Sequence, residues 1–191
     1  MINMKVGMKK NICAALIKMT QQASGRFNVD MKKNIYTALI LTVALLCDII
    51  SKTVIVKNFG FFERVDFLGG FLRITLVYNE GGVFGIFQGY KNIFLIISFI
   101  VLFLMVAYYI YEKNKTILFC SAMALITSGA IGNIIDRLLE SRPGVVDFIS
   151  IGVDGVYRWP TFNIADTCIV IGAAILIIVF YKEERKRKTQ N

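Results

Sequence analysis

The sequence predicts an all-α membrane protein with four transmembrane helices and a small extracytoplasmic β-sheet region between the first and second helices. The chain has 191 residues, of which 56% are hydrophobic and only two are proline, so it is too apolar for an ordinary soluble domain. It contains four apolar stretches of about 20 residues, the length that crosses a hydrocarbon core of about 30 Å as a helix. Its basic residues gather at the ends of these stretches.

The four predicted spans cover residues 35–56, 93–111, 117–135 and 164–181. We expect residues 1–33 to form a cytoplasmic N-terminal extension, and residues 34–181 to form one four-helix domain with outer-face loops at 57–91 and 138–162. Residues 182–191 are expected to form a basic cytoplasmic tail.

The distribution of positive charge predicts the orientation in the membrane. The net charge is +9, and 14 of the 22 lysines and arginines precede the first span, lie in the turn after the second or follow the fourth. Cytoplasmic segments are enriched in Lys and Arg, so we expect both termini in the cytoplasm and the two long loops at the outer face. Because the basic residues orient the spans, we expect no nucleic-acid partner.

The first outer loop is expected to contain short strands. Its residues 65–87 mix β-branched and aromatic side chains with the glycine pairs Gly69-Gly70 and Gly81-Gly82, a pattern typical of strands joined by glycine turns. The second outer loop carries turn signals at Pro143-Gly144 and Trp159-Pro160. We expect the two loops to wall a groove.

The N-terminal extension contains a near repeat. The segment MKKNICAALI from Met8 and the segment MKKNIYTALI from Met31 share eight of ten residues. Two interpretations of residues 1–30 follow: an extension that precedes a natural start at Met31, or a basic helix that lies on the inner membrane surface.

The chain has no histidine, which removes the Ser/His/Asp triad, the Cys/His dyad and the HExxH zinc site together. Its four cysteines lack CxxC spacing, and we interpret them as small core residues. Any chemistry must therefore use other groups.

Ionisable residues inside the spans are the first candidates, since lipid makes an unpartnered charge expensive. On the first span Asp48 and Lys52 lie four residues apart, on one face of the helix. They form a pair that either fastens this helix to the bundle or braces an active site from behind.

A stripe of small and polar residues runs along one face of the third span to its outer end. Gly129, Asn133 and Arg137 recur every four residues, with Asp136 beside them. This stripe indicates either close helix packing that ends in an Asp/Arg pair, or a functional arginine that holds a substrate carbonyl or a carboxylate.

Two more acids lie near the outer end of the fourth span. Asn163 and Asp166 are three residues apart on one helix face, and Asp147 lies in the apolar run GVVDFI just before this helix. Two carboxyl groups in a low-dielectric site resist ionising together, so one keeps its proton near neutral pH, as in an aspartic protease dyad. One acid then activates water while the protonated one polarises a carbonyl. A binding site or ion path would use the same groups.

Two other functions would use these acids. Asp136, Asp147 and Asp166 would hold Mg²⁺ in an enzyme that performs phosphoryl chemistry on a lipid. Asp48 and Asp166 would carry protons in a small transporter, but the sequence has no inverted repeat to provide alternating access.

Five motifs follow one another from Met31 onward. They are CDIISK in the first span, NEGGVFG before the second, SGAIGNIIDR closing the third, GVVDFI in the next loop and FNIAD opening the fourth. In this order they resemble the bacterial lipoprotein signal peptidases, the signal peptidase II family. Two features depart from that family: the long N-terminal region, and Gly82-Val83 where the family often has two alanines.

The resemblance implies that Asp147 and Asp166 are the catalytic pair of an intramembrane aspartyl endopeptidase. It implies supporting or substrate-binding roles for Asn79, Gly81, Gly129, Asn133, Asp136, Arg137, Asn163, Asp48 and Lys52. It equates the glycine-rich outer segment with the family's β-cradle, which rests on the membrane surface. It implies no metal ion and no organic cofactor.

The implied reaction is hydrolysis of the peptide bond just before a diacylglyceryl-modified cysteine, which releases the signal peptide of a bacterial prolipoprotein. The implied partners are these signal peptides, membrane lipid and globomycin-type inhibitors. The implied location is the bacterial cytoplasmic (inner) membrane, with the active site near the outer face. We expect Gly129 and Gly132 to make room for the substrate helix, and either aspartate is a candidate for the shared proton.

Overall fold

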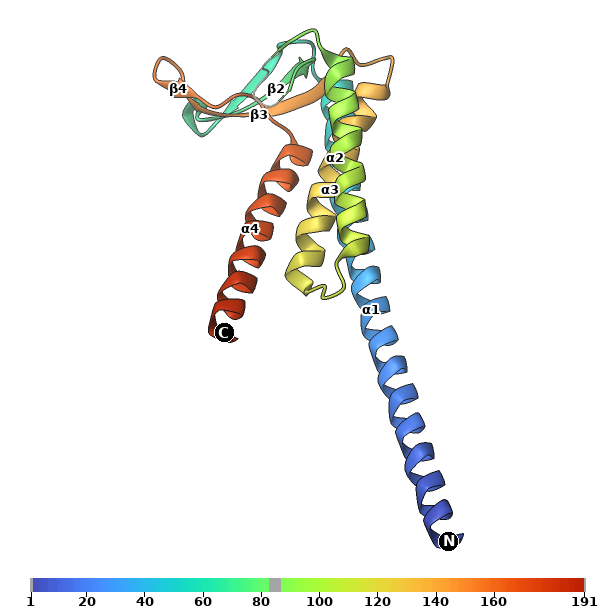
Figure 1. The fold of residues 1–191 in the computed structure, drawn as a ribbon. Coiled ribbons are helices and arrows are strands. Elements are labelled where there is room, and N and C mark those ends of the chain that lie inside the picture. Colours follow the sequence, from blue (N-terminus) through green and yellow to red (C-terminus); the bar gives the residue numbers. More distant parts are fainter. Residues whose placement is uncertain (1, 83–86, 191) are drawn as a thin grey trace. The chain divides into compact units, whose positions relative to one another are not determined.

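The chain forms four long helices, with two strands after the first helix and two more after the third (Figure 1). The computed structural model describes residues 2–82 and 87–190, with the side chains of residues 24–25, 29–82 and 87–189. The elements are α1 (Ile2–Asn58), β1 (Arg64–Phe67), the short 3-10 helix η1 (Leu68–Gly70), β2 (Leu72–Asn79), α2 (Lys91–Tyr111), α3 (Ile117–Leu138), β3 (Val145–Val153), β4 (Tyr157–Arg158) and α4 (Ile164–Gln190). The chain divides into two units, Met1–Tyr36 and Thr37–Asn191.

The four predicted spans are confirmed. Each lies within a helix long and apolar enough to cross a membrane, at Val29–Asn58, Lys91–Tyr111, Ile117–Leu138 and Ile164–Thr189. Helices α1 and α4 run on through residues 33 and 182 without a break. The domain boundaries predicted there from charge therefore stay predictions, as do the two interpretations of residues 1–30.

The four strands form one antiparallel sheet in the order β1-β2-β3-β4. Strands β1 and β2 lie in the first outer loop, as predicted, and the turn between them uses Gly69 and Gly70 at φ values of 65° and 88°, which glycine adopts without a Cβ clash. The sequence predicts only turns in the second outer loop, whereas the structure has β3 and β4 there. Each outer loop thus supplies half of the sheet.

The pairing of β2 with β3 aligns two candidate site residues. Asn79 lies opposite Val145, and Val77 lies opposite Asp147, after a register irregularity that begins at Ile74. A one-residue slip of a strand turns every side chain to the other face, so this register decides that Asn79 and Asp147 approach each other.

A small apolar cluster fastens the sheet to the end of α1. It consists of Ile55, Leu76, Val146 and Phe148, none more than 7% exposed. Burying side chains of this size contributes about 1.5–3 kcal/mol each. The cluster therefore fixes the two central strands beside the helix that carries Asp48 and Lys52.

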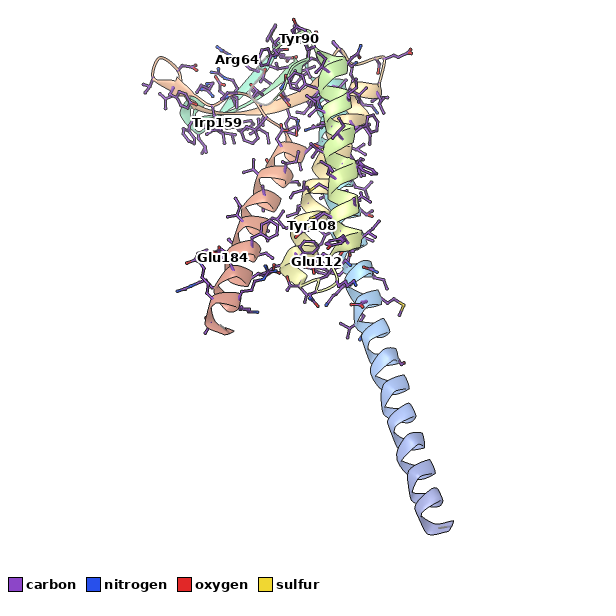
Figure 2. The ribbon with its side chains drawn as sticks, viewed as in Figure 1. Arg64, Tyr90, Tyr108, Glu112, Trp159 and Glu184 are labelled. Carbon is purple, nitrogen blue, oxygen red and sulfur yellow. The ribbon has the colours of Figure 1, made fainter. Side chains whose placement is uncertain are left out.

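Helix α3 is the most enclosed of the four helices. Most residues of its most apolar 18-residue stretch are buried inside the protein, whereas no residue of α2 is buried in the described structure. In Figure 2 the labelled Arg64, Tyr90 and Trp159 lie at the end of the helices beside the sheet. Tyr108 and Glu112 lie at the end of α2 that is far from the sheet. A second apolar cluster of Phe119, Met123 and Val179 joins α3 to α4.

Glycine brings α3 and α4 close together. A methyl group at Gly172 would lie 2.7 Å from Ile126 Cγ1 and 2.9 Å from the Ala122 carbonyl oxygen. Small residues at such positions let helix backbones approach in lipid, where van der Waals packing drives association.

We predict that Gly172→Leu destabilises the protein by about 1–3 kcal/mol, the usual cost of overpacking a tight contact. The measurement is the thermal midpoint in detergent. Ala174→Leu is the matched control, because Ala174 is exposed on the same helix; it should change stability by no more than about 0.5 kcal/mol. Equal midpoints for the two variants would contradict this account of the contact.

Candidate active site

The polar residues singled out in the sequence gather where α1, α3, the start of α4 and the ends of β2 and β3 meet. Several of them are almost completely buried: Asp48, Lys52, Asn133, Asp136, Arg137, Asp147 and Asn163. Buried polar groups are stable only when they are hydrogen-bonded or paired. The contacts below account for nearly all of them.

The fourth helix begins with a reciprocal cap between Asn163 and Asp166. Asn163 Oδ1 accepts a hydrogen bond from the backbone N–H of Asp166 at 2.8 Å, and Asp166 Oδ2 accepts one from the backbone N–H of Asn163 at 3.2 Å. This is the capping-box arrangement, which satisfies free N–H groups at a helix start. The three-residue spacing of Asn163 and Asp166 in FNIAD is therefore the spacing that a capping box requires.

Asparagine side chains connect the two candidate catalytic acids. Asn163 Nδ2 donates to Asp147 Oδ1 at 2.7 Å, while the same residue caps the helix that carries Asp166. Asn79 Nδ2 donates to Asp147 Oδ2 at 3.1 Å, and Asn133 Nδ2 donates to Asp166 Oδ1 at 2.9 Å. Each acid thus accepts hydrogen bonds on both of its oxygens.

Hydrogen bonds to the side-chain oxygens of Asn133 and Asn79 fix the orientation of their amide groups. Asn133 Oδ1 accepts from Lys52 Nζ at 3.0 Å, and Asn79 Oδ1 accepts from the backbone N–H of Gly81 at 3.0 Å. Because the oxygen of each side chain is engaged by a donor, its NH₂ group must point toward the carboxylate. The sequence offers no signal for this arrangement beyond the presence of asparagine.

Lys52 satisfies all three donors of its ammonium group in the interior. Its Nζ lies 2.8 Å from Asp48 Oδ2, 2.9 Å from Asp136 Oδ2 and 3.0 Å from Asn133 Oδ1. The predicted pairing of Asp48 with Lys52 is present, and Asp136 extends it. The two interpretations of the pair are both compatible with this geometry, since it joins α1 to α3 and also supports Asn133.

Asp48 also fastens the start of α4. Its Oδ1 accepts a hydrogen bond from the backbone N–H of Ala165 at 2.8 Å. A side chain at Gly132 would overlap Asp48 Oδ2, and one at Gly129 would overlap the Ala165 carbonyl oxygen. The sequence predicts that these glycines make room for a substrate helix, but in the structure they admit Asp48 and α4.

Asp136 does not pair with its neighbour Arg137, contrary to one interpretation of the stripe. Its carboxylate faces Lys52 and Arg142, and its Oδ2 accepts the backbone N–H of Val146 at 3.2 Å. The described residues include no group of three or more His, Cys, Asp or Glu arranged to hold a metal ion. The three-aspartate Mg²⁺ arrangement is therefore not the one that these side chains form.

Arg137 points toward the first outer loop. Its Nη2 donates to the Gly81 carbonyl oxygen at 3.0 Å, and its Nη1 donates to the Asn133 carbonyl oxygen at 3.4 Å. Within the described part of the chain, its buried Nε has no hydrogen-bond partner. A buried N–H of this kind is costly unless something else accepts from it.

Asp147 has the electrostatic setting of a protonated acid. Burial raises the pKa of its carboxyl group, and the nearby charge of Asp166 raises it further, to about 7. Hydrogen bonds from Asn79 and Asn163 act in the opposite direction and limit the rise. The carboxyl group therefore keeps a proton at a pH where an exposed aspartate is fully ionised.

The structure brings together every candidate residue predicted from the sequence, with Gly129 acting in helix packing. Val83 lies outside the described residues. Two further residues contact the site and were not predicted from the sequence. Gln88 Nε2 donates to Asn79 Oδ1 at 3.2 Å, and Arg142 forms an ion pair with Asp136. Both lie in loops, where nothing in the local sequence indicates a contact with a buried partner.

Comparison with known proteins gives one consistent result. The family model described as signal peptidase (SPase) II matches residues 40–182. A lipoprotein signal peptidase of Staphylococcus haemolyticus is 34% identical over 161 residues, which cover 83% of this chain and 100% of that protein. One of Borrelia hermsii is 39% identical over 161 residues, covering 79% of this chain and 92% of that protein.

A solved structure has the same fold. It is described as a bacterial membrane enzyme structure at 2.3 Å resolution by the in meso method, and it matches with a TM-score of 0.70 and 32% identity. The match covers 78% of this chain and 88% of the solved chain. The four-helix arrangement with its small sheet is therefore shared with a membrane enzyme.

We predict that Lys52→Met destabilises the protein by about 3–5 kcal/mol, because it leaves buried carboxylates without their shared ammonium. The measurement is again the thermal midpoint in detergent. Lys57→Met is the control, since Lys57 is exposed at the end of the same helix. A Lys52→Met protein as stable as this control would show that the buried contacts do not support the fold.

Proposed function

Because the chain belongs to the signal peptidase II family, we propose that it is an intramembrane aspartyl endopeptidase that removes signal peptides from diacylglyceryl-modified prolipoproteins. Cleavage falls just before the lipidated cysteine. The observation that carries the mechanism is the position of Asn163, which donates to Asp147 and caps the helix start where Asp166 lies. Family membership supports a peptidase, and the contacts of the two acids support the aspartyl type.

We assign the role of general base to Asp166. It lies in the first turn of α4, where the helix dipole favours a negative side chain, and it is less deeply buried than Asp147. In this role its carboxylate takes a proton from a water molecule. The water oxygen then attacks the carbonyl carbon of the peptide bond before the lipidated cysteine.

We assign the role of general acid to Asp147. Its proton passes to the carbonyl oxygen as negative charge develops there, which gives a tetrahedral diol intermediate that is hydrogen-bonded to both acids. When the C–N bond breaks, the proton held by Asp166 passes to the leaving amine, and the oxygen returns its proton to Asp147. Both acids then regain their starting states, so the cycle balances.

Arg137 is proposed to bind a backbone carbonyl of the substrate. Its buried Nε has no partner among the described residues, and its other contacts fix the guanidinium plane. An arginine stays charged at any working pH and donates from a rigid fork. A substrate carbonyl beside this group would satisfy the free N–H and place the scissile bond near the two acids.

The proposed setting is the bacterial cytoplasmic membrane, with both termini in the cytoplasm and the site near the outer face. Within residues 37–191, the sheet lies at one end of the helices, while the labelled Glu112 and Glu184 lie at the other (Figure 2). The basic residues of the turn after α2 and of the tail occur at that second end, as the positive-inside rule requires of a cytoplasmic face. The exposed aromatic side chains Phe61, Phe62 and Trp159 on the sheet side suit the opposite interface.

We predict that Asp147→Asn and Asp166→Asn each reduce cleavage of a diacylglyceryl-modified prolipoprotein in detergent by at least about 10³-fold, because each removes a proton-transfer step of the dyad. Asp154→Asn is the matched control, because Asp154 lies in the β3–β4 turn and is paired with Arg73 and Arg158 rather than with a site residue. It should cleave at close to the wild-type rate.

Adding a chelator to the wild type separates the proposal from the lipid phosphoryl alternative. Cleavage that continues in chelator agrees with the two-acid mechanism. Normal cleavage by either dyad variant, or loss of wild-type cleavage in chelator, would refute it.

The raised pKa of Asp147 predicts a pH dependence. Below about pH 7 Asp147 is protonated and serves as the acid, whereas above it Asp147 ionises and the general acid is lost. We expect kcat/KM to fall about tenfold per pH unit on the alkaline side. A kcat/KM profile that stays flat from about pH 6 to about pH 9 would contradict the assignment of Asp147 as the acid.

A further inference from the structure

The loop between α3 and β3 contains an arginine that has no part in the mechanism above. Arg142 forms an ion pair with Asp136 Oδ1, and its side chain is 13% exposed. Asp136 is 1% exposed, so the pair reaches from the loop into the interior. Its guanidinium comes from the loop, whereas the other members of this charged cluster, Asp48, Lys52 and Asp136, lie on helices.

Asp136 connects this arginine to the strand that carries Asp147. While Oδ1 faces Arg142, Oδ2 accepts the backbone N–H of Val146 at 3.2 Å. Val146 immediately precedes Asp147 and is completely buried. A shift of the Asp136 carboxylate would therefore move the backbone at the proposed general acid.

The same loop is fastened on its other sides. Lys91 Nζ, at the start of α2, donates to the Arg142 carbonyl oxygen at 2.8 Å. A side chain at Gly144 would overlap the Asn79 carbonyl oxygen, so the loop backbone lies directly against the end of β2. The loop thus contacts the start of α2 and the end of β2, the strand that carries Asn79, a hydrogen-bond donor to Asp147.

The charges of the cluster balance only when Arg142 is present. Asp48 and Asp136 contribute two negative charges, and Lys52 and Arg142 contribute two positive ones. Without Arg142, Lys52 alone would serve two buried carboxylates. An uncompensated buried charge is strongly unfavourable, so Asp136 would turn toward water or shift toward Lys52.

We propose that Arg142 is a positioning residue, which holds Asp136 in place so that the Val146 amide keeps Asp147 aligned with Asp166. This inference rests on the proposed function, because the alignment matters for cleavage by the two acids. Within the described residues, the polar contacts of Arg142 are with Asp136 and Lys91, not with Asp147 or Asp166.

The test compares Arg142→Gln, Arg142→Lys, Asp136→Asn and the double variant Arg142→Gln/Asp136→Asn in the full-length protein. Lys188→Gln is the control, since it removes one positive charge from an exposed ion pair with Glu184 on α4. For each variant, kcat and KM are measured with a diacylglyceryl-modified prolipoprotein, together with the thermal midpoint.

Arg142→Gln is expected to lower kcat by about tenfold to a hundredfold, the usual effect of a small misplacement of a reacting group. Its KM should stay within about twofold of the wild type, because no substrate contact is lost. Arg142→Lys should recover most of kcat. The double variant should have a higher kcat than Arg142→Gln, since neutralising Asp136 restores the charge balance.

Three results would overturn the inference. They are a wild-type kcat in Arg142→Gln, a rise in KM at unchanged kcat, and a double variant no better than Arg142→Gln. If Arg142→Gln fails to fold, the inference requires that the double variant folds and cleaves, and a double variant that also fails to fold or to cleave would overturn it. Failure of the proposed function is recognised separately, because Asp147→Asn and Asp166→Asn would then still cleave.

Discussion

The ammonium group of Lys52 is the constraint on which the rest of the site depends. A charge within an apolar bundle must be fully partnered, and this one has an acceptor for each of its three N–H groups. Each acceptor then serves a second element: Asp48 fastens the start of α4, Asp136 fastens the start of β3, and Asn133 faces the acid on α4. One buried cation therefore sets the relative positions of four elements, α1, α3, β3 and α4, which no single helix–helix contact would do.

The start of α4 combines a folding signal with a candidate catalytic group. The capping box needs a side-chain acceptor at its first residue and an acid three residues later, and Asn163 and Asp166 meet this need. The spare amide hydrogen of the cap residue is then free to reach the second acid. The helix start is thus stabilised by the same residue that brings the two carboxylates into one hydrogen-bonded group.

The helices and most site residues are predictable from the sequence, because lipid enforces a length of apolar residues and makes each buried polar group conspicuous. The resemblance of the five motifs assigns Asp147 and Asp166 as the candidate catalytic pair, whereas spacing alone leaves other combinations of acids open. Strand β3 is not predictable locally, because GVVDFI becomes a strand by pairing with β2, more than sixty residues earlier in the chain. Arg142 is missed for a similar reason, since its partner is buried in another element. The glycines are correctly recognised as sites of close approach, but the group that approaches Gly132 is Asp48.

The hydrogen bond from Ala165 to Asp48 joins residues 117 positions apart. At a ribosomal rate of about 5–20 residues per second, the first span is made on the order of ten seconds before the backbone that completes its contacts. During this interval Lys52, one helical turn away, is the local counter-charge of Asp48. The ion pair thus partners Asp48 before α4 exists, and under the proposed mechanism the nascent chain cannot cleave a peptide until α4, which carries Asp166, has been made.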